Sequence, residues 1–184
     1  MWAELATYVG RIRQFTRRDW ILYTLWVSTI AGLAFSTGGF LAIGAHKGVP
    51  FPPSALLVPI GAAVFALAIA VDTIGHRTIY KEAIRGGEDL VHKITILCGV
   101  ASVVLIVLAY EHPIAAIPAA VFTILSIIYS LVDEVFHWRR YVRHGSDRVE
   151  MWSHVGILTG HLTMMGGWWA WYLGGYAGVA ETLR

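Results

Sequence analysis

The chain has 184 residues, enough for one domain, and hydrophobic residues make up 57% of it whereas charged residues make up 14%. This composition, with a mean hydropathy of +0.61, excludes an ordinary soluble domain. The formal net charge of +2 does not indicate nucleic-acid binding, because the basic residues gather where membrane topology alone would place them. The sequence predicts an all-α integral membrane protein.

Residues 1–19 carry several arginines and no long apolar run. Their apolar positions recur at helical spacing, for example at Leu5, Tyr8 and Ile12, as in helices that lie on a membrane surface. We therefore expect an N-terminal interfacial segment, and a merely basic flank is the alternative.

Five apolar stretches follow, each close to the roughly 17 to 25 residues that a helix needs to cross a bilayer. We expect five transmembrane helices at residues 20–44, 51–76, 92–110, 113–137 and 152–174. The first follows a basic segment as a secretory signal would, but it is long for a signal and lacks a convincing cleavage site, so we interpret it as an uncleaved anchor. The last four are expected to form a four-helix bundle of two tandem helical hairpins.

Lys and Arg gather in alternate connections, as they do in the cytoplasmic loops of membrane proteins. They precede the first span and recur after the second and fourth spans, whereas the other side has only Lys47 and Arg184. This distribution predicts a multi-pass protein of the cell (inner) membrane with its N-terminus in the cytoplasm and its C-terminus outside.

The two hairpins repeat one pattern of acidic residues, histidines and tyrosines, with one residue added in the second loop. The first copy has Asp72, His76, Tyr80, Glu88 and His92, and the second has Asp133, His137, Tyr141, Glu150 and His154. Both copies run in the same direction through the membrane, so a pseudo-twofold axis along the membrane normal is expected to relate them.

Each Asp-x-x-x-His or Glu-x-x-x-His pair points two ligand-type side chains to one face of a helix. All four pairs lie at the cytoplasmic border of the bilayer. Antiparallel packing within each hairpin is expected to place Asp72 beside His92, with His76 beside Glu88 one turn below. The expected metal ligands are Asp72, His76, Glu88, His92, Asp133, His137, Glu150 and His154.

This ligand set predicts a site for two transition-metal ions. Four carboxylates would neutralise two divalent cations, and nitrogen and oxygen ligands suit iron, with zinc, manganese and copper as alternatives. The arrangement follows the logic of di-iron carboxylate bundles although not their Glu-x-x-His motif. The single cysteine, Cys98, excludes a thiolate cluster. A purely structural polar cluster, a haem site and a proton relay are the other interpretations.

Three further residues are candidates for catalysis. Tyr80 and Tyr141 extend the Asp-His faces by one turn, where a phenol could hold a substrate or take part in redox chemistry. His161 lies two turns above His154 and breaks the repeat, because the first copy has Gly99 there. Membrane anchoring for the tyrosines and a buried hydrogen-bonded role for His161 are the alternatives.

The segment DEVFHW, residues 133–138, resembles the Asn/Asp-x-x-x-His metal segment in the third subunit of particulate methane and ammonia monooxygenases. The interval from there to His154 is longer and more hydrophilic in this chain. The His-x-x-His boxes of membrane desaturases and hydroxylases are absent from the sequence, so we assign no family.

These observations predict a membrane oxidoreductase with a dinuclear, iron-like site that acts on a lipid-soluble or amphipathic substrate, with dioxygen or a quinone as reaction partner. A membrane metal-ion transporter, a haem-binding electron-transfer subunit and an assembly subunit of a larger membrane complex are the alternatives. The expected partners are the lipid bilayer and a small lipid-soluble molecule. A homo-oligomer and a larger membrane complex both remain open.

Overall fold

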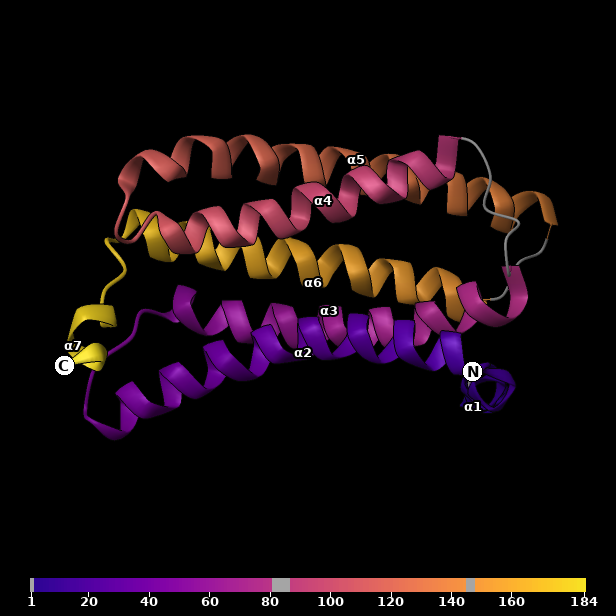
Figure 1. Ribbon diagram of the computed structural model, residues 1–184, viewed down its shortest axis with the longest axis horizontal. Helices are drawn as coiled ribbons and strands as arrows, with labels where there is room; N and C mark the ends of the chain where they lie inside the picture. Colours follow the sequence, from indigo (N-terminus) through magenta and orange to yellow (C-terminus); the bar gives the residue numbers. More distant parts are fainter. Residues whose placement is uncertain (1, 81–86, 145–147) are drawn as a thin grey trace.

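The fold consists of long helices that run side by side (Figure 1). The computed structural model describes residues 2–80, 87–144 and 148–184. Within these ranges the regular elements are α1 (Trp2–Gly10), η1 (Arg11–Gln14), α2 (Arg17–His46), α3 (Pro53–Gly75), η2 (His76–Tyr80), α4 (Gly87–Leu108), η3 (Pro113–Ala115), α5 (Ala116–His144), α6 (Arg148–Leu173) and α7 (Val179–Leu183).

Four helices have the length and apolar composition of membrane spans. They are Arg17–His46, Pro53–Ile79, Leu90–Leu108 and Pro113–Arg143. Large apolar side chains point outward from them, as the exposed fractions of Phe35 (79%), Leu67 (71%) and Leu97 (67%) illustrate. Apolar surface of this extent is unusual in a soluble monomer and suits contact with lipid. The fold is consistent with a multi-pass helical membrane protein.

α6 is not among these four helices, although the described ranges include all of it. It carries His154 and His161, and its buried positions run from Val149 to Trp171. Protein therefore covers much of its length. The crossing of the membrane by residues 152–174 stays a prediction.

Local sequence signals explain where the first long helices begin. At the start of α2, Thr16 Oγ1 accepts a hydrogen bond from the Asp19 N–H, and the Asp19 carboxylate accepts one from the Thr16 N–H. This reciprocal capping box satisfies two N–H groups that a helix start leaves without partners. α3 begins at Pro53, where the missing N–H costs nothing. Gly48, with φ of 77°, forms the turn between the two helices.

The closest helix pairs join the two sequence repeats. α3 packs along α6, and α4 packs along α5. α2 covers α3, and α6 lies between α3 and the α4–α5 pair (Figure 1). The expectation that the nearest partners lie within one hairpin is therefore wrong. The repeat pattern indicates which face of a helix turns inward, but it does not specify which neighbour covers that face.

Small residues bring the backbones of α3 and α6 together. A Cβ atom at Gly61 would lie 2.3 Å from the Met164 nitrogen, and one at Gly160 would lie 2.6 Å from the Phe65 nitrogen. Small residues at helix interfaces are typical of packing within membranes, where close van der Waals contact replaces the hydrophobic effect. The contact holds the two helices in one register along their length.

The chain termini lie at opposite ends of the molecule (Figure 1). At one end, α1 contacts α3 and α6, with the Tyr8 side chain only 1% exposed beside Ile74 and Val149. The N-terminal segment is thus packed onto the bundle, while Trp2 on the same helix stays exposed. We call this the α1 end of the molecule and the opposite one the α7 end.

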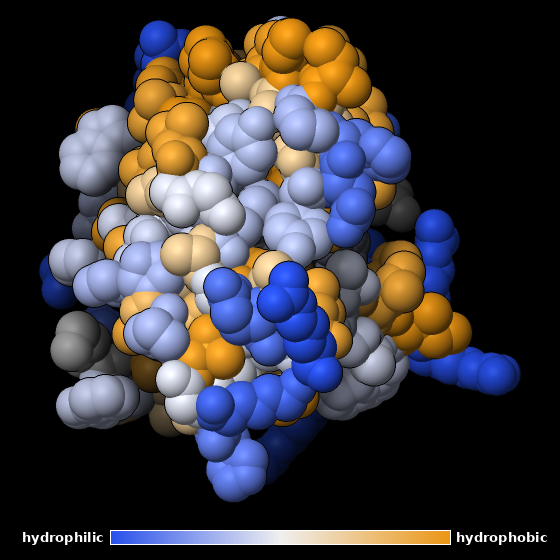
Figure 2. All heavy atoms as spheres, turned by 90° about the vertical axis from the view of Figure 1, so that its left-hand side faces the viewer, coloured by the Kyte–Doolittle hydropathy of each residue, from blue (hydrophilic) through white to orange (hydrophobic). Residues whose placement is uncertain are grey.

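At the α7 end an apolar core fills the space between the helices. It includes Ile106, Met164, Met165 and Trp168, all nearly inaccessible to solvent. Tyr176 closes this core and donates a hydrogen bond of 2.5 Å from its Oη to the Ile106 carbonyl oxygen. Figure 2 views the molecule from this end, where hydrophilic residues gather between apolar flanks. The buried acidic residues lie toward the other end.

Candidate metal site

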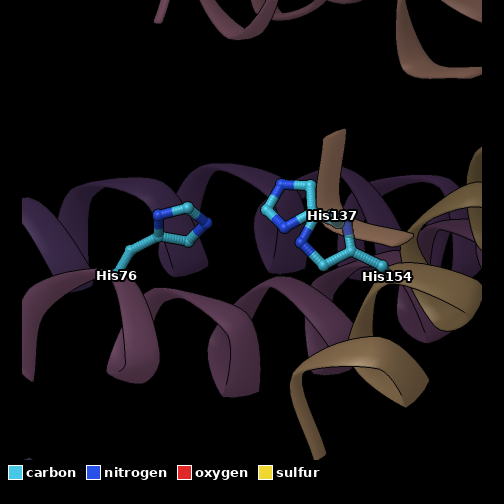
Figure 3. Close-up of side chains that lie close together, drawn as sticks. All are labelled: His76, His137 and His154. Atoms are coloured by element: carbon cyan, nitrogen blue, oxygen red, sulfur yellow. The ribbon is translucent and has the colours of Figure 1, made fainter. Parts of the chain in front are cut away.

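Histidines from three helices meet near the α1 end. His76 begins the π-helical turn η2 after α3, His137 belongs to α5 and His154 to α6. Each offers one ring nitrogen, and these atoms all lie within 4.8 Å of one another. The rings of His137 and His154 lie side by side with centroids 3.5 Å apart, and the His76 ring faces them across a gap (Figure 3). This is the first ligand group.

Asp72 joins the first group from one turn before His76 on α3. Its Oδ2 lies 3.3 Å from His76 Nε2, and its Oδ1 lies 3.1 Å from His154 Nε2. The Asp72 side chain is 8% exposed and that of His154 is 2% exposed. A carboxylate so poorly hydrated needs close positive or hydrogen-bonding partners. Asp72 therefore connects α3 and α6 through the site.

A second ligand group lies beside the first. His92 of α4, Asp133 of α5 and His137 each offer one ligand atom, again within 4.8 Å of one another. Asp133 Oδ2 lies 3.1 Å from His92 Nδ1 and 3.7 Å from His137 Nε2. His137 thus belongs to both groups.

The two groups repeat one set of contacts in the two sequence copies. Asp72 of the first copy contacts His154 of the second, and Asp133 of the second copy contacts His92 of the first. Each aspartate is also near the histidine one turn along its own helix, at 3.3 Å and 3.7 Å. The expected pairing of Asp72 with His92 is therefore wrong. The aspartate of each copy instead reaches the second helix of the other copy.

Glu150 and Arg140 surround the far nitrogen of His137. His137 Nδ1 lies 3.1 Å from Glu150 Oε1 and 2.8 Å from Arg140 Nη2. Arg140 Nη2 is also 3.7 Å from Glu150 Oε1. Glu150 is fully buried. With its hydrogen on Nδ1, His137 donates to Glu150 and leaves Nε2 free to bind a cation. In the other tautomer, Nδ1 accepts from Arg140 Nη2, because a guanidinium only donates. Here the structure places Glu150 behind the ligand group rather than in it.

The repeat pattern does not indicate Glu134, which follows Asp133 directly in the sequence. Its Oε1 lies 3.1 Å from His154 Nδ1, opposite the nitrogen that faces Asp72. α5 packs between two neighbours, so Asp133 faces α4 while the next residue faces α6. The sequence does contain a signal for Glu134. It forms an adjacent acidic pair with Asp133, on a helix that is expected to have two neighbouring helices.

The side chains of two further predicted residues, Glu88 and Tyr80, lie outside what the structure describes. Tyr141 is described, and its ring packs beside the exposed Trp138 with centroids 5.9 Å apart. It belongs to neither ligand group among the described residues. A catalytic role for Tyr141 stays a prediction.

His161 also lies apart from both ligand groups. Its ring stacks on Phe65 of α3, with centroids 5.7 Å apart and an interplanar angle of 18°. Its Nε2 lies 3.4 Å from Ser126 Oγ of α5. The residue is 4% exposed. It is a buried, hydrogen-bonded histidine held above the ligand groups.

The arrangement can bind cations because imidazole nitrogens and carboxylate oxygens from several helices converge there. Such a mixed nitrogen and oxygen set suits divalent first-row transition metals. No protein-family model, curated protein or solved structure matches the chain. The functional argument therefore depends on the geometry of the site.

Proposed function

We propose that this chain is an integral membrane metalloprotein with a dinuclear site, and that it acts as an oxidoreductase on a lipid-soluble or amphipathic substrate. In this proposal α2 to α6 form five membrane spans and the α1 end faces the cytoplasm. Arg77, Arg139 and Arg148 lie near that end, as the positive-inside tendency requires. The protein would then belong to the cell membrane.

The observation that carries the proposal is the convergence of two ligand groups that share His137. Ionisable side chains within a helical membrane protein are costly, and they usually mark functional sites. Here such side chains come from α3, α4, α5 and α6 to one level of the bundle. Helix capping or isolated ion pairs would not require four histidines at one point.

The charge of the site supports two divalent ions. Asp72, Asp133, Glu134 and Glu150 carry four negative charges, and Arg140 offsets one of them. The remaining charge is close to what two divalent cations and one hydroxide would neutralise. Iron fits both this ligand chemistry and a redox function, while zinc, manganese or copper fit the ligands alone.

The position of the site favours a substrate that dissolves in the bilayer. The ligand groups lie where apolar helices give way to basic connections, at a membrane border. A quinone or another amphipathic molecule could reach this level from the lipid, with its polar group toward the site. Two adjacent metal ions can polarise and orient such a group.

Elemental analysis and an absorption spectrum of purified protein, never exposed to chelator, test the proposal. We expect about two transition-metal ions per chain and their loss in the Asp72→Asn/Asp133→Asn double variant. Less than half an equivalent of every transition metal would contradict the metal site. A Soret band would point to haem instead.

The redox function needs a separate test with the metal-loaded protein in liposomes. Quinol oxidation with dioxygen, followed by quinone absorbance, is expected to exceed that of the same double variant. Metal ions that cross the liposome membrane, without any turnover of quinol, would indicate a transporter rather than an oxidoreductase.

A further inference from the structure

The N-terminal segment, residues 2–19, packs over the end of α3 that leads to His76. α1 contacts α3 and α6, and η1 contacts α3 and the π-helical turn η2. His76 is the first residue of η2. Helix ends fray readily, so a ligand at this place depends on contacts from outside its own helix. π-helical turns are also rare, and they are frequent at functional sites.

Both chain neighbours of His76 contact the N-terminal segment. On one side, Gly75 lies against Tyr8, which is 1% exposed. A Cβ atom at Gly75 would overlap the Tyr8 hydroxyl oxygen, so glycine lets Tyr8 pack directly on the α3 backbone. On the other side, Arg77 forms an ion pair with Asp19 through both its Nε and its Nη2.

Asp19 joins this ion pair to the start of α2. Its Oδ2 accepts hydrogen bonds from the Thr16 N–H at 2.9 Å and from the Thr16 hydroxyl at 2.7 Å, while its Oδ1 faces Arg77. Asp19 is 7% exposed, and a carboxylate with so little hydration depends on such partners. The capping box therefore gives Arg77 a fixed point of attachment.

The second sequence copy holds its histidine in another way. His137 lies well inside α5, so the helix continues on both sides of it. At the positions of Gly75 and Arg77 the second copy has Phe136 and Trp138, and Trp138 is 58% exposed. The residues that flank His76 thus depart from the repeat at the points where the N-terminal segment touches them.

We propose that the N-terminal segment positions His76 for metal binding in the first ligand group. Tyr8 and Asp19 are positioning residues, which act through Gly75 and Arg77. Without their contacts the turn that carries His76 opens more often, and its ring leaves the other two histidines of the group. This inference rests on the proposed function, because it takes His76 as a metal ligand.

Binding of Co²⁺ to the full-length protein in detergent, measured by competition with a chromogenic chelator, tests this role. We expect Arg77→Gln to lower the affinity roughly ten-fold, the lower end of the loss for a residue that orients a metal ligand. Removal of a positive charge would by itself strengthen cation binding, so the sign of the effect distinguishes positioning from charge. The control is Arg139→Gln, which removes an exposed arginine of α5 and should bind Co²⁺ at least as tightly as the parent.

The same substitution in the His76→Ala variant separates positioning from a general effect on the fold. His76→Ala leaves the second ligand group intact. In this background Arg77→Gln should change the Co²⁺ affinity by less than about two-fold, the usual error of additivity. In the metal-free protein, Arg77→Gln should speed hydrogen–deuterium exchange of the amides of residues 76–80 roughly ten-fold, the equilibrium factor of one charge-assisted hydrogen bond.

Gly75→Ala tests the Tyr8 contact without a change of charge. The added methyl group meets the Tyr8 hydroxyl oxygen, so we expect a loss of Co²⁺ affinity that Tyr8→Phe partly restores in the double variant. A double variant no better than Gly75→Ala would overturn the role assigned to Tyr8.

Two results would overturn the proposal as a whole. One is an Arg77→Gln effect of equal size with and without His76, and the other is unchanged amide exchange at residues 76–80. Absence of Co²⁺ binding in the parent would instead overturn the proposed metal site, and this inference with it.

Discussion

His137 belongs to both ligand groups, so its removal should affect both ion positions. We expect His137→Ala to retain less than one metal ion per chain, whereas His92→Ala should retain about one because only the second group includes His92. Elemental analysis after gel filtration measures this difference. His112→Ala, at the exposed turn of the opposite end, should bind metal like the parent. Equal metal contents for the His137 and His112 variants would show that the shared position is misassigned.

Glu134 holds the nitrogen of His154 that points away from Asp72. A carboxylate behind a metal-binding histidine fixes the ring orientation and raises ligand basicity, and its loss typically lowers metal affinity by roughly 10 to 100-fold. We expect a loss in this range for Glu134→Ala and a smaller one for Glu134→Gln, which can still accept a hydrogen bond. Competition with a chromogenic chelator measures the affinity. Glu181→Gln, on the exposed part of α7, is the control.

Should both Glu134 variants bind metal as tightly as the Glu181 variant, Glu134 would be a solvated neighbour of His154 with no part in orienting it. The same comparison separates charge from hydrogen bonding. A loss confined to Glu134→Ala would identify the hydrogen bond as the more important contribution.

At the scale of helices, the small residues between α3 and α6 set the distance between Asp72 and His154. We expect Gly160→Ala to destabilise the protein by about 1 to 3 kcal/mol, because the added methyl group meets the Phe65 backbone and overpacks the interface. Unfolding in denaturing detergent measures the stability. Metal binding should weaken as well, since the helices that carry Asp72 and His154 are pushed apart.

Gly166→Ala provides the control on the same helix, because a Cβ atom there meets nothing within 4 Å. It replaces glycine by a better helix former and should leave stability unchanged or slightly raised. If the Gly160 and Gly166 variants unfold alike, the close contact between α3 and α6 does not contribute to stability.

The sequence predicts where each helix lies along the chain far better than it predicts which helices pack against one another. Hydropathy indicates the four long apolar helices, and four-residue spacing indicates which face of each carries the acidic residues and histidines. Neither pattern specifies that Asp72 meets His154 rather than His92, because both partners lie at the same membrane depth. That choice depends on side-chain size, at Gly61 and Gly160, and not on polarity. The sequence pattern does not indicate Glu134 for the same reason, since the role of this residue depends on a second helix that neighbours α5.

At the scale of the whole molecule, the number of spans decides on which side each terminus lies. With α6 as a fifth span, we expect the N-terminus in the cytoplasm and the C-terminus outside. Reporter fusions at each terminus, one active only in the cytoplasm and one only outside, measure the two positions. Reporters that place both termini on one side would leave four spans and contradict the crossing of α6.

The dependence of α6 on α3 has a consequence for synthesis of the protein. α6 follows the other long helices in synthesis, and it has less tendency than they have to partition into lipid on its own. Asp72 and His76 are therefore translated well before their partner His154, by roughly 4 to 16 seconds at ordinary elongation rates. During that interval the nascent chain has half of a site and nothing to close it. The first ligand group can therefore form only after α6 has joined α3.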